Sequence, residues 1–400
     1  MNTRRRGLVS FAAIALSAAP AAAQWRVVSL HPAGANRSFA YGEDAGRQGG
    51  TIEPGALFVG RAALWTGNGA SWVSLHPDGA TLSEVLGVHA GQQVGYVDAP
   101  GGGFAGLWTG SAASLVNLGP VGAIWSRARG VHAGQQVGEA IVGSIHRAGL
   151  WRGTAASWVD LHDPAAELSG AIGVERGRQV GYVSIGETIR ASLWTGTAAS
   201  RVDLHPPGAT YSCAYGVDGD QQVGVAITDH WRASVWSGTA ASWTDLHPVG
   251  AAASFAFSAD GGQQVGYVEL PVATPLSSLT QHASLWSGAA ATWVDLHEFL
   301  PDTFYNSVAH SIRRDGGVTT VVGYGYNCST ARTEALMWVG PNATPCYLDC
   351  NADGQPTVAD FGCFQAQFVL GQSYADCNED CALTVADFGC FQTRFVAGCP

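Results

Sequence analysis

The chain has 400 residues, a net charge of −11 and only 13% charged residues, and all 20 of its basic residues are arginine. The arginines gather into no basic stripe, which argues against nucleic acid as a partner. Hydrophobic residues make up 46% of the chain, enough for a sizeable core, and no stretch after the N-terminus reads as a membrane-spanning helix.

The N-terminus has the pattern of a secretory signal peptide. Arg4–Arg6 form a basic segment, residues 7–19 are apolar but too short to span a bilayer comfortably, and Ala21–Ala23 offer a cleavage site before Gln24. We therefore predict a signal peptide over 1–23, cleaved near Ala23, and a mature protein that is secreted or held at the cell surface.

A Leu/Val/Met-Trp motif, usually followed by a small residue and Gly, recurs along most of the chain. Its tryptophans are Trp65, Trp108, Trp151, Trp194, Trp236, Trp286 and Trp338. The first four steps are 42–43 residues, and a fixed period in this range indicates a propeller or a solenoid. Each repeat holds four short runs rich in Val, Trp, Tyr and Leu, separated by Gly or Pro, and 25–340 shows no helical periodicity.

Proline marks where one repeat unit ends. The Leu-His run is followed by a Pro-containing link, as at Pro206–Gly208, and proline belongs between sheets because it lacks the amide hydrogen of the ladder. Six complete four-stranded blades then lie between about Ser38 and His297. Residues 306–338 supply three strands of a seventh, and Trp25–His31 matches the missing fourth. We predict an all-β, seven-bladed β-propeller over 24–340, closed by its N-terminal strand, in preference to an open solenoid.

The ring offers no catalytic motif, and we assign no catalytic residue. A histidine recurs after Leu, as at His76 and His205, with Gly119 in its place in one copy. A metal ring is the alternative to the favoured interpretation, a histidine that bonds its own turn in each blade. Asp160, Asp203, Asp245 and Asp295 also follow the repeat and are interpreted as structural. Two insertions, around 270–278 and 298–305, are predicted to form a partner surface.

The C-terminal residues 341–400 contain a doubled loop typical of calcium sites. Asp349-Cys-Asn-Ala-Asp-Gly returns as Asp376-Cys-Asn-Glu-Asp-Cys, and oxygen ligands at loop positions 1, 3, 5, 7, 9 and 12 bind Ca²⁺. The predicted ligands are Asp349, Asn351, Asp353, Gln355, Thr357 and Asp360 in the first loop, and Asp376, Asn378, Asp380, Ala382, Thr384 and Asp387 in the second. Cys381 stands where the sharp turn favours glycine, which weakens the second site. A helix is expected after each loop, because Phe361, Phe364 and Phe368 are spaced to share one face.

Seven of the nine cysteines lie between Cys346 and Cys399, which in an exported protein indicates a disulfide-stapled domain. Three bridges are expected among Cys346, Cys350, Cys363, Cys377, Cys390 and Cys399. Their connectivity is left open, with Cys381 as the odd cysteine. Whether Cys213 pairs with Cys328 is also left open.

Two resemblances follow from these motifs. The region 24–340 resembles the HAF family of extracellular repeats through His282-Ala-Ser-Leu-Trp286 and the Gly-Gln-Gln-Val-Gly elements, which implies export but no established activity. The tail resembles cysteine-rich dockerin-like modules. This implies Ca²⁺-dependent folding and docking to a cohesin-like or cell-surface protein through Val358, Ala359, Val385 and Ala386.

Together these patterns lead to a functional prediction. We expect an exported, non-catalytic binding or scaffold protein, tethered by its tail, with a glycan or protein ligand on the propeller. The alternative is a polysaccharide-active enzyme with its site in the propeller channel.

Overall fold

The computed structural model describes residues 25–55, 59–271, 279–341, 358–369, 377 and 384–397. The chain divides into two compact units, one spanning Trp25–Thr344 and one containing the C-terminal residues from Pro345, and each is considered by itself below. No helix in the described ranges is long and apolar enough to cross a membrane.

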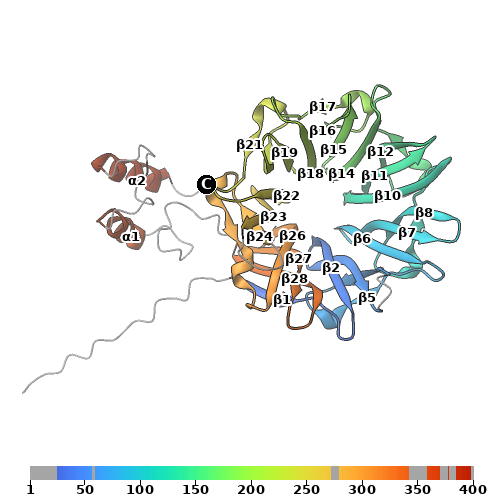
Figure 1. Cartoon of the computed structure of the whole chain (residues 1–400), viewed down its shortest axis with the longest axis horizontal. Coiled ribbons are helices and arrows are strands. Elements are labelled where there is room, and N and C mark those ends of the chain that lie inside the picture. Colours follow the sequence, from blue (N-terminus) through green and yellow to red (C-terminus); the bar gives the residue numbers. More distant parts are fainter. Residues whose placement is uncertain are drawn as a thin grey trace, which may run out of the picture. The chain divides into compact units, whose positions relative to one another are not determined.

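The first unit is a seven-bladed β-propeller, in which seven four-stranded antiparallel sheets follow one another around a ring (Figure 1). Six blades are built from consecutive strands. The seventh combines β26, β27 and β28 with the N-terminal strand β1, which pairs with β28 in the register Val27 to Trp338 and Val28 to Met337. The predicted assignment of strands to blades and the predicted closure by the N-terminal strand are therefore confirmed.

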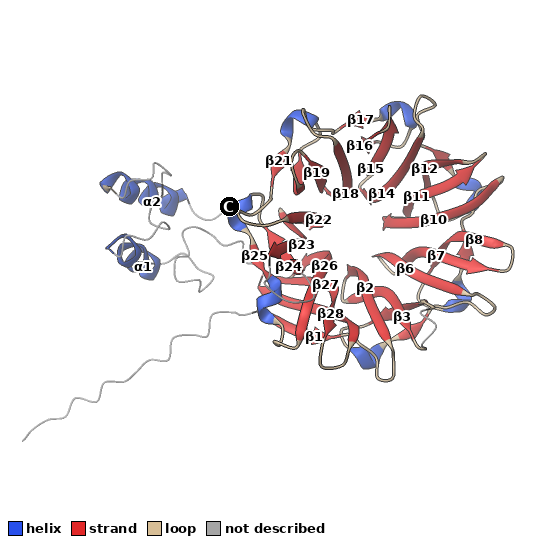
Figure 2. Cartoon of the chain, viewed as in Figure 1, coloured by secondary structure: helices blue, strands red, loops and turns tan. Residues whose placement is uncertain are grey.

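In each blade the four strands are named below in order from the centre of the ring to its outer edge, and Figure 2 shows the strands in red. Blades 1 to 3 consist of β2 (Arg37–Asp44), β3 (Arg47–Glu53), β4 (Arg61–Trp65) and β5 (Val73–Ser74); β6 (Leu82–His89), β7 (Gln92–Ala99), β8 (Gly102–Trp108) and β9 (Val116–Asn117); and β10 (Ala123–His132), β11 (Gln135–Val142), β12 (Ile145–Trp151) and β13 (Val159–Asp160). Blades 4 and 5 consist of β14 (Leu168–Glu175), β15 (Arg178–Ile185), β16 (Thr188–Trp194) and β17 (Val202–Asp203); and β18 (Tyr211–Asp218), β19 (Gln221–Ile227), β20 (Trp231–Trp236) and β21 (Thr244–Asp245). Blades 6 and 7 consist of β22 (Ala253–Asp260), β23 (Gln263–Pro271), β24 (Leu279–Trp286) and β25 (Val294–Asp295); and β26 (Phe304–Asp315), β27 (Val318–Asn327), β28 (Arg332–Pro341) and β1 (Arg26–Ser29).

The repeated tryptophan anchors each blade to the preceding one. All seven tryptophans of the repeat are 0% exposed. Trp194 of blade 4, for example, packs in one cluster with Leu150 and Leu161 of blade 3, and Trp65 of blade 1 packs with Leu30 beside β1. The core is thus a circle of seven inter-blade clusters, which explains why a repeat cannot bury its apolar face alone.

The Gln-Gln-Val-Gly element and its variants make the same hydrogen bond in blades 1 to 6. The second glutamine, buried at Gln93 and Gln179, accepts a hydrogen bond from the glycine amide after the tryptophan: Gly110 N lies 2.8 Å and Gly196 N 2.7 Å from the amide oxygen. The glycine of the element is required by a close approach of the neighbouring strand. A Cβ at Gly50 would lie 1.9 Å from the carbonyl oxygen of Phe39.

The two insertions and the cysteines of the ring can now be placed. The insertion at 298–305 adds Leu300 and Phe304, 8% and 9% exposed, to the core between blades 6 and 7, while residues 301–303 are exposed, so its role as a partner surface stays a prediction. The other insertion falls mostly on 272–278, outside the described residues. Cys213 and Cys328 do not pair, since both are free thiols and Cys213 is buried.

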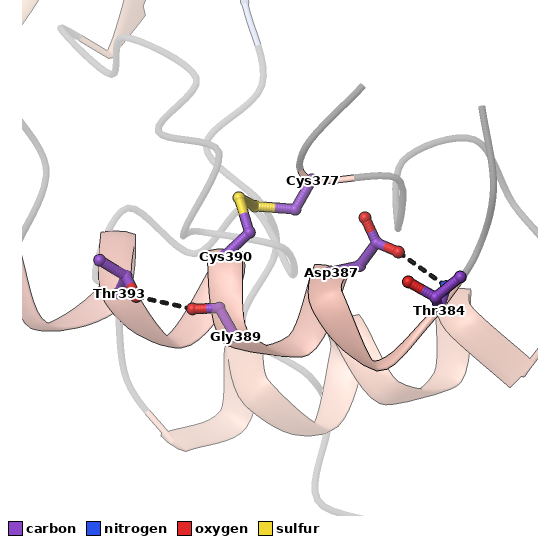
Figure 3. The surroundings of a disulfide bond; sticks show 6 residues. All are labelled: Cys377, Thr384, Asp387, Gly389, Cys390 and Thr393. Atoms are coloured by element: carbon purple, nitrogen blue, oxygen red, sulfur yellow. Dashed lines mark hydrogen bonds between the residues drawn. A yellow bond between two sulfur atoms is a disulfide. The ribbon is translucent and has the colours of Figure 1, made fainter. Parts of the chain in front are cut away.

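The described part of the second unit contains two helices, α1 (Val358–Val369) and α2 (Val385–Ala397). Phe364 and Phe391 are fully buried and stack with ring centroids 4.1 Å apart, so the predicted phenylalanine faces form its small core. A disulfide joins Cys377 to Cys390, close to Thr384 and Asp387 at the start of α2 (Figure 3). This bridge is one of those open to the six cysteines named above.

Candidate functional site

A β-bulge in every innermost strand turns one extra side chain into the centre of the ring. In β2, for instance, the pairing with β3 shifts between Ala40 and Gly42, which leaves Tyr41 without an opposing residue. The same shift occurs at the same place in the other six inner strands. The seven bulged residues are Tyr41, Leu86, Arg129, Ile172, Tyr215, Phe257 and His310. Because a bulge re-aims a side chain, this ring of residues defines the channel lining.

All seven bulged residues line one cavity of about 500 Å³. They are half-buried, so their side chains remain accessible from the channel. The volume falls within the usual range for sites that bind small molecules or peptide segments, ~300–1,000 Å³. The axial channel of the propeller is therefore the candidate functional site.

One side of the channel is aromatic. Phe257 of blade 6 stacks on His310 of blade 7 with centroids 5.0 Å apart, and His310 meets Tyr41 of blade 1 edge-on at 5.1 Å. Tyr215 of blade 5 contacts Phe257 at 5.3 Å, and Tyr324 lies behind His310 at 5.3 Å. We call this set, from Tyr215 through Phe257 and His310 to Tyr41, the aromatic wall. Such a wall offers large, rigid apolar area to a bound side chain.

The opposite side of the channel carries paired charges from blades 2 and 3. Arg127 forms an ion pair with Glu84, and Arg129 forms one with Glu139, whose carboxylate oxygen lies 2.7 Å from the guanidinium. We call Glu84, Arg127, Arg129 and Glu139 the charged wall. The Arg127 side chain is 27% exposed and lines the cavity. The charged wall therefore presents a guanidinium to an acidic ligand group.

In the Arg129–Glu139 pair the carboxylate is shielded from solvent, while the Arg129 side chain is 31% exposed. Burial pulls the pKa of Arg129 down, and the Glu139 carboxylate with its hydrogen bond more than reverses this, so the net pKa is raised. Glu139 is 3% exposed and also accepts a hydrogen bond from the Tyr182 hydroxyl at 3.1 Å. Burial first, and then the same carboxylate, raises the pKa of Tyr182. Arg129 therefore stays charged and Tyr182 stays neutral at neutral pH.

At the end of the channel where the inner strands finish, acidic side chains join neighbouring blades. Asp44 accepts from the amide of Ala90 at 2.7 Å, Asp218 from Gly261 at 2.7 Å and Asp260 from Arg314 at 2.6 Å. Each contact links one blade to the next one along the chain. These carboxylates hold neighbouring blades together, because each of them accepts a hydrogen bond from a backbone amide of the next blade.

The recurring histidines also serve the blade junctions. In six junctions Nδ1 lies 2.7–2.9 Å from a buried serine hydroxyl of the next inner strand, as in His205 with Ser212. In three of the six, His76, His205 and His247, Nε2 also faces the carbonyl oxygen four residues later, at 2.9–3.2 Å. Burial lowers the pKa of these rings, to about 4 for His297. The histidines thus have structural partners, but the contact that all six share is with the next blade, and the predicted bond to their own turn is found in three.

The channel shows binding chemistry rather than an assembled hydrolytic centre. His310 is its one bulged histidine, and in the described ranges its Nε2 has no hydrogen-bond partner. Ser258 and Ser311 line the cavity, and Ser311 Oγ accepts the Glu43 amide at 3.3 Å. Within these ranges no serine is therefore seen bonded to His310 Nε2 as a nucleophile would be to its base. The sequence analysis did not single out the bulged residues.

His310 gives the ring a pH-dependent stability. Burial lowers its pKa to about 4, whereas an unfolded histidine titrates near ~6.5. Between these values the unfolded chain binds a proton that the folded chain refuses, so stability falls as the pH drops from 6.5 to 4. We expect His310→Phe to reduce this pH dependence by about one proton, measured as the slope of unfolding free energy against pH. An unchanged slope would show that His310 titrates normally in the folded ring.

Few of the predicted metal ligands are described. Asp360 and Asp387 are fully buried in the first turns of α1 and α2, and Asp387 accepts the backbone amide of Thr384 at 2.8 Å. The Thr384 hydroxyl accepts from Ala386 N at 3.2 Å, so Thr384 and Asp387 form a local N-terminal cap for α2. The other predicted ligands, Asp349, Asn351, Asp353, Gln355, Thr357, Asp376, Asn378, Asp380 and Ala382, lie outside the described residues. The described residues contain no cluster of metal-binding side chains.

Comparison with known proteins identifies the fold. The sequence matches no family model and no curated protein. Among solved structures, the chain is similar to a puromycin hydrolase at 13% identity, with a TM-score of 0.51, covering 78% of this chain and 55% of that one. It is also similar to the β-propeller domain of the trilobed protease from Pyrococcus furiosus at 10% identity, with a TM-score of 0.50, covering 76% of this chain and 94% of that one.

These similarities correct the functional prediction. The sequence-based expectation of a non-catalytic scaffold, with a polysaccharide-active enzyme as its alternative, is contradicted because the similar propellers belong to a puromycin hydrolase and a protease. The chain spans about half the length of the puromycin hydrolase, and identity this low establishes the fold alone. The protease propeller is described as an open velcro, whereas β1 and β28 close the ring in this chain.

Proposed function

We propose that the ring has a peptidase-type role, in which its channel admits and binds peptide substrate. The observation that carries this proposal is the single cavity with an aromatic wall on one side and a charged wall on the other. The peptidase propellers of the same fold support it. Hydrolysis itself is assigned to no residue of this chain.

The two walls match the two parts of a peptide. An aromatic or large aliphatic side chain gains apolar burial and ring stacking between Tyr41, Phe257 and Tyr215, with an aromatic pair worth ~0.5–1.5 kcal/mol beyond area burial. A carboxylate on the same peptide meets the guanidinium of Arg127, whose side chain is 27% exposed on the cavity. The preferred substrate is therefore a peptide that carries an acidic residue close to an aromatic one.

The test is a calorimetric titration of the full chain with four hexapeptides that differ at two positions. One position is Phe or Ala and the other is Glu or Gln. We expect the Phe/Glu peptide to bind most tightly and each replacement to weaken binding about tenfold, since one good contact is worth ~1.4 kcal/mol. Equal affinity for all four peptides, or no binding, would overturn the proposal.

A matched pair of arginine variants locates the interaction. Arg127 and Arg147 are both about one-third exposed and each forms an ion pair, but only Arg127 lines the channel. Arg127→Gln should erase the preference for Glu over Gln, whereas Arg147→Gln should leave all four affinities unchanged. A loss of that preference in both variants would point to long-range charge rather than to the channel.

For the tail, we propose that the doubled loop binds Ca²⁺ and that the protein is exported. The Cys377–Cys390 disulfide supports an oxidising compartment, and the exposed Val385 and Ala386 at the start of α2 are accessible to a partner such as a cohesin-like protein. Calorimetric titration of the oxidised full chain with Ca²⁺ tests this, and Asp387→Asn should weaken the second site. A chain that releases no heat with Ca²⁺ would leave Asp387 with its capping role alone.

A further inference from the structure

One of the seven blade junctions lacks the histidine that the other six share. Gly119 occupies the position between blades 2 and 3, and its amide bonds Asn117 at 2.7 Å, as the His162 amide bonds Asp160 at 2.8 Å. Leu118 N likewise bonds Ala105 O at 2.8 Å, matching Leu161 N and Ala148 O at 2.9 Å in the next junction. The backbone of this junction therefore keeps the shared framework, and only the imidazole ring is missing.

The polar groups that hold the imidazole elsewhere are still present. Ser126 is 1% exposed, and its oxygen accepts the amide of Ala105 at 2.9 Å, which is the bond its counterparts make in every junction. In the other six junctions the hydroxyl also meets a histidine Nδ1. No second partner of the Ser126 hydroxyl is found in the described ranges. Ala123, four residues after Gly119, supplies the carbonyl that faces Nε2 elsewhere.

A cavity lies where the ring would sit. Its volume is about 280 Å³, and Gly119, Ala123 and Ser126 line it together with Phe104 and Trp125. A Cβ built on Gly119 would lie 3.0 Å from Asn117 Oδ1 and 3.5 Å from Ser126 Oγ, among the residues that line this space. The cavity is thus lined by two aromatic side chains and by one buried hydroxyl that lacks the histidine partner of its counterparts. It shares no lining residue with the channel cavity.

We propose that this cavity is a binding site for a neutral imidazole ring, supplied by a free imidazole compound or by a histidine of a peptide. The Ser126 hydroxyl donates to one ring nitrogen, the other ring N–H donates to the Ala123 carbonyl, and Phe104 and Trp125 flank the ring. The bound ring reproduces the pair of bonds made by His76, His205 and His247. This inference does not depend on peptide binding in the channel.

The hydrogen-bond pattern fixes the protonation state of the ligand. Ser126 Oγ accepts the Ala105 amide, and no acceptor for its own proton is found in the described ranges, so an unprotonated ring nitrogen satisfies this buried hydroxyl. An imidazolium has no such acceptor. Binding of a histidine derivative should therefore strengthen as the pH rises through ~6.5, where the ring loses its charge.

The experiment uses the full chain and saturation-transfer NMR of two probes, imidazole and N-acetylhistidinamide, at pH 8 and pH 5. We expect binding at pH 8 and at least a tenfold loss at pH 5. Gly119→His should abolish binding, because the built-in ring fills the cavity, and should raise the melting temperature of the ring. Binding of imidazole alone identifies a free compound as the ligand, and binding of the amide identifies peptidyl histidine.

Two serine variants serve as a matched pair. Ser126→Ala removes the hydroxyl from the cavity, while Ser212→Ala makes the same change in the junction that contains His205. Only Ser126→Ala should weaken imidazole binding, even if both variants are destabilised. The proposal is overturned if neither probe binds the native chain, or if binding persists unchanged in Gly119→His.

Discussion

Replacing Glu139 by alanine is expected to destabilise the ring by about 2–3 kcal/mol, because it removes two charge-assisted hydrogen bonds from Arg129 and leaves the Tyr182 hydroxyl without its partner. Glu139 is 3% exposed, receives two hydrogen bonds from Arg129 at 2.7 and 3.1 Å, and also holds the Tyr182 hydroxyl. Urea-induced unfolding of the full chain measures the loss.

Two comparisons isolate the buried Glu139 carboxylate as the cause. Asp220→Ala removes the partner of Arg178 in an exposed pair, in which the Asp220 side chain is 84% exposed, and should cost no more than about 1 kcal/mol. The double variant Arg129→Leu/Glu139→Leu should recover most of the loss, since apolar side chains then replace both members of the pair. A Glu139→Ala variant as stable as the Asp220→Ala variant would contradict this account.

Replacing Leu30 by alanine should open the ring at its closure. Leu30 is 0% exposed in the cluster between blades 7 and 1, and its amide bonds Ala335 O at 2.9 Å. A buried Leu→Ala change costs ~2–5 kcal/mol. Because β1 is joined to β28 by pairing and packing rather than by a hairpin, this loss should promote local opening. We expect amide hydrogen exchange in β28 to accelerate by more than tenfold.

Leu204 provides the matched control for the closure. It is also 0% exposed, and its amide bonds Ala191 O at 2.9 Å, but hairpins and tight turns connect all four strands of its blade. Leu204→Ala should lower global stability by a similar amount without selective exchange in β28. Equal exchange in the two variants would mean that the closing strand is no weaker than any other.

The points at which the chain passes from one blade to the next could be predicted from sequence, because proline and glycine are restricted to particular places in a sheet. The proline after each Leu-His run excluded that link from a sheet, and the lone copy at Trp25–His31 then had only one sheet left to complete. Repeat periodicity could not show that 298–305 enters the core. Leu300 and Phe304 pack there as part of an insertion that has no counterpart in other blades.

The residues that line the channel could not be predicted from the sequence, because a β-bulge interrupts the two-residue alternation of side chains along a strand. Tyr41 and Gly42 lie on the inner strand where simple alternation would assign opposite faces, yet both line the channel. A signal was nevertheless present. The residue just before each Gly-Val element varies from Leu86 to Arg129 to Ile172 while its neighbours repeat, which is typical of positions freed from packing and available for binding.

Photocrosslinking tests peptide binding in the channel most directly. A Phe/Glu hexapeptide whose aromatic residue is replaced by benzoylphenylalanine is bound to the full chain, irradiated, and mapped by mass spectrometry. We expect crosslinks on the inner strands β2, β18, β22 and β26, suppressed by excess unmodified Phe/Glu peptide. Crosslinks confined to outer strands or to the C-terminal helices, or crosslinks that excess peptide does not suppress, would contradict a peptide-binding channel.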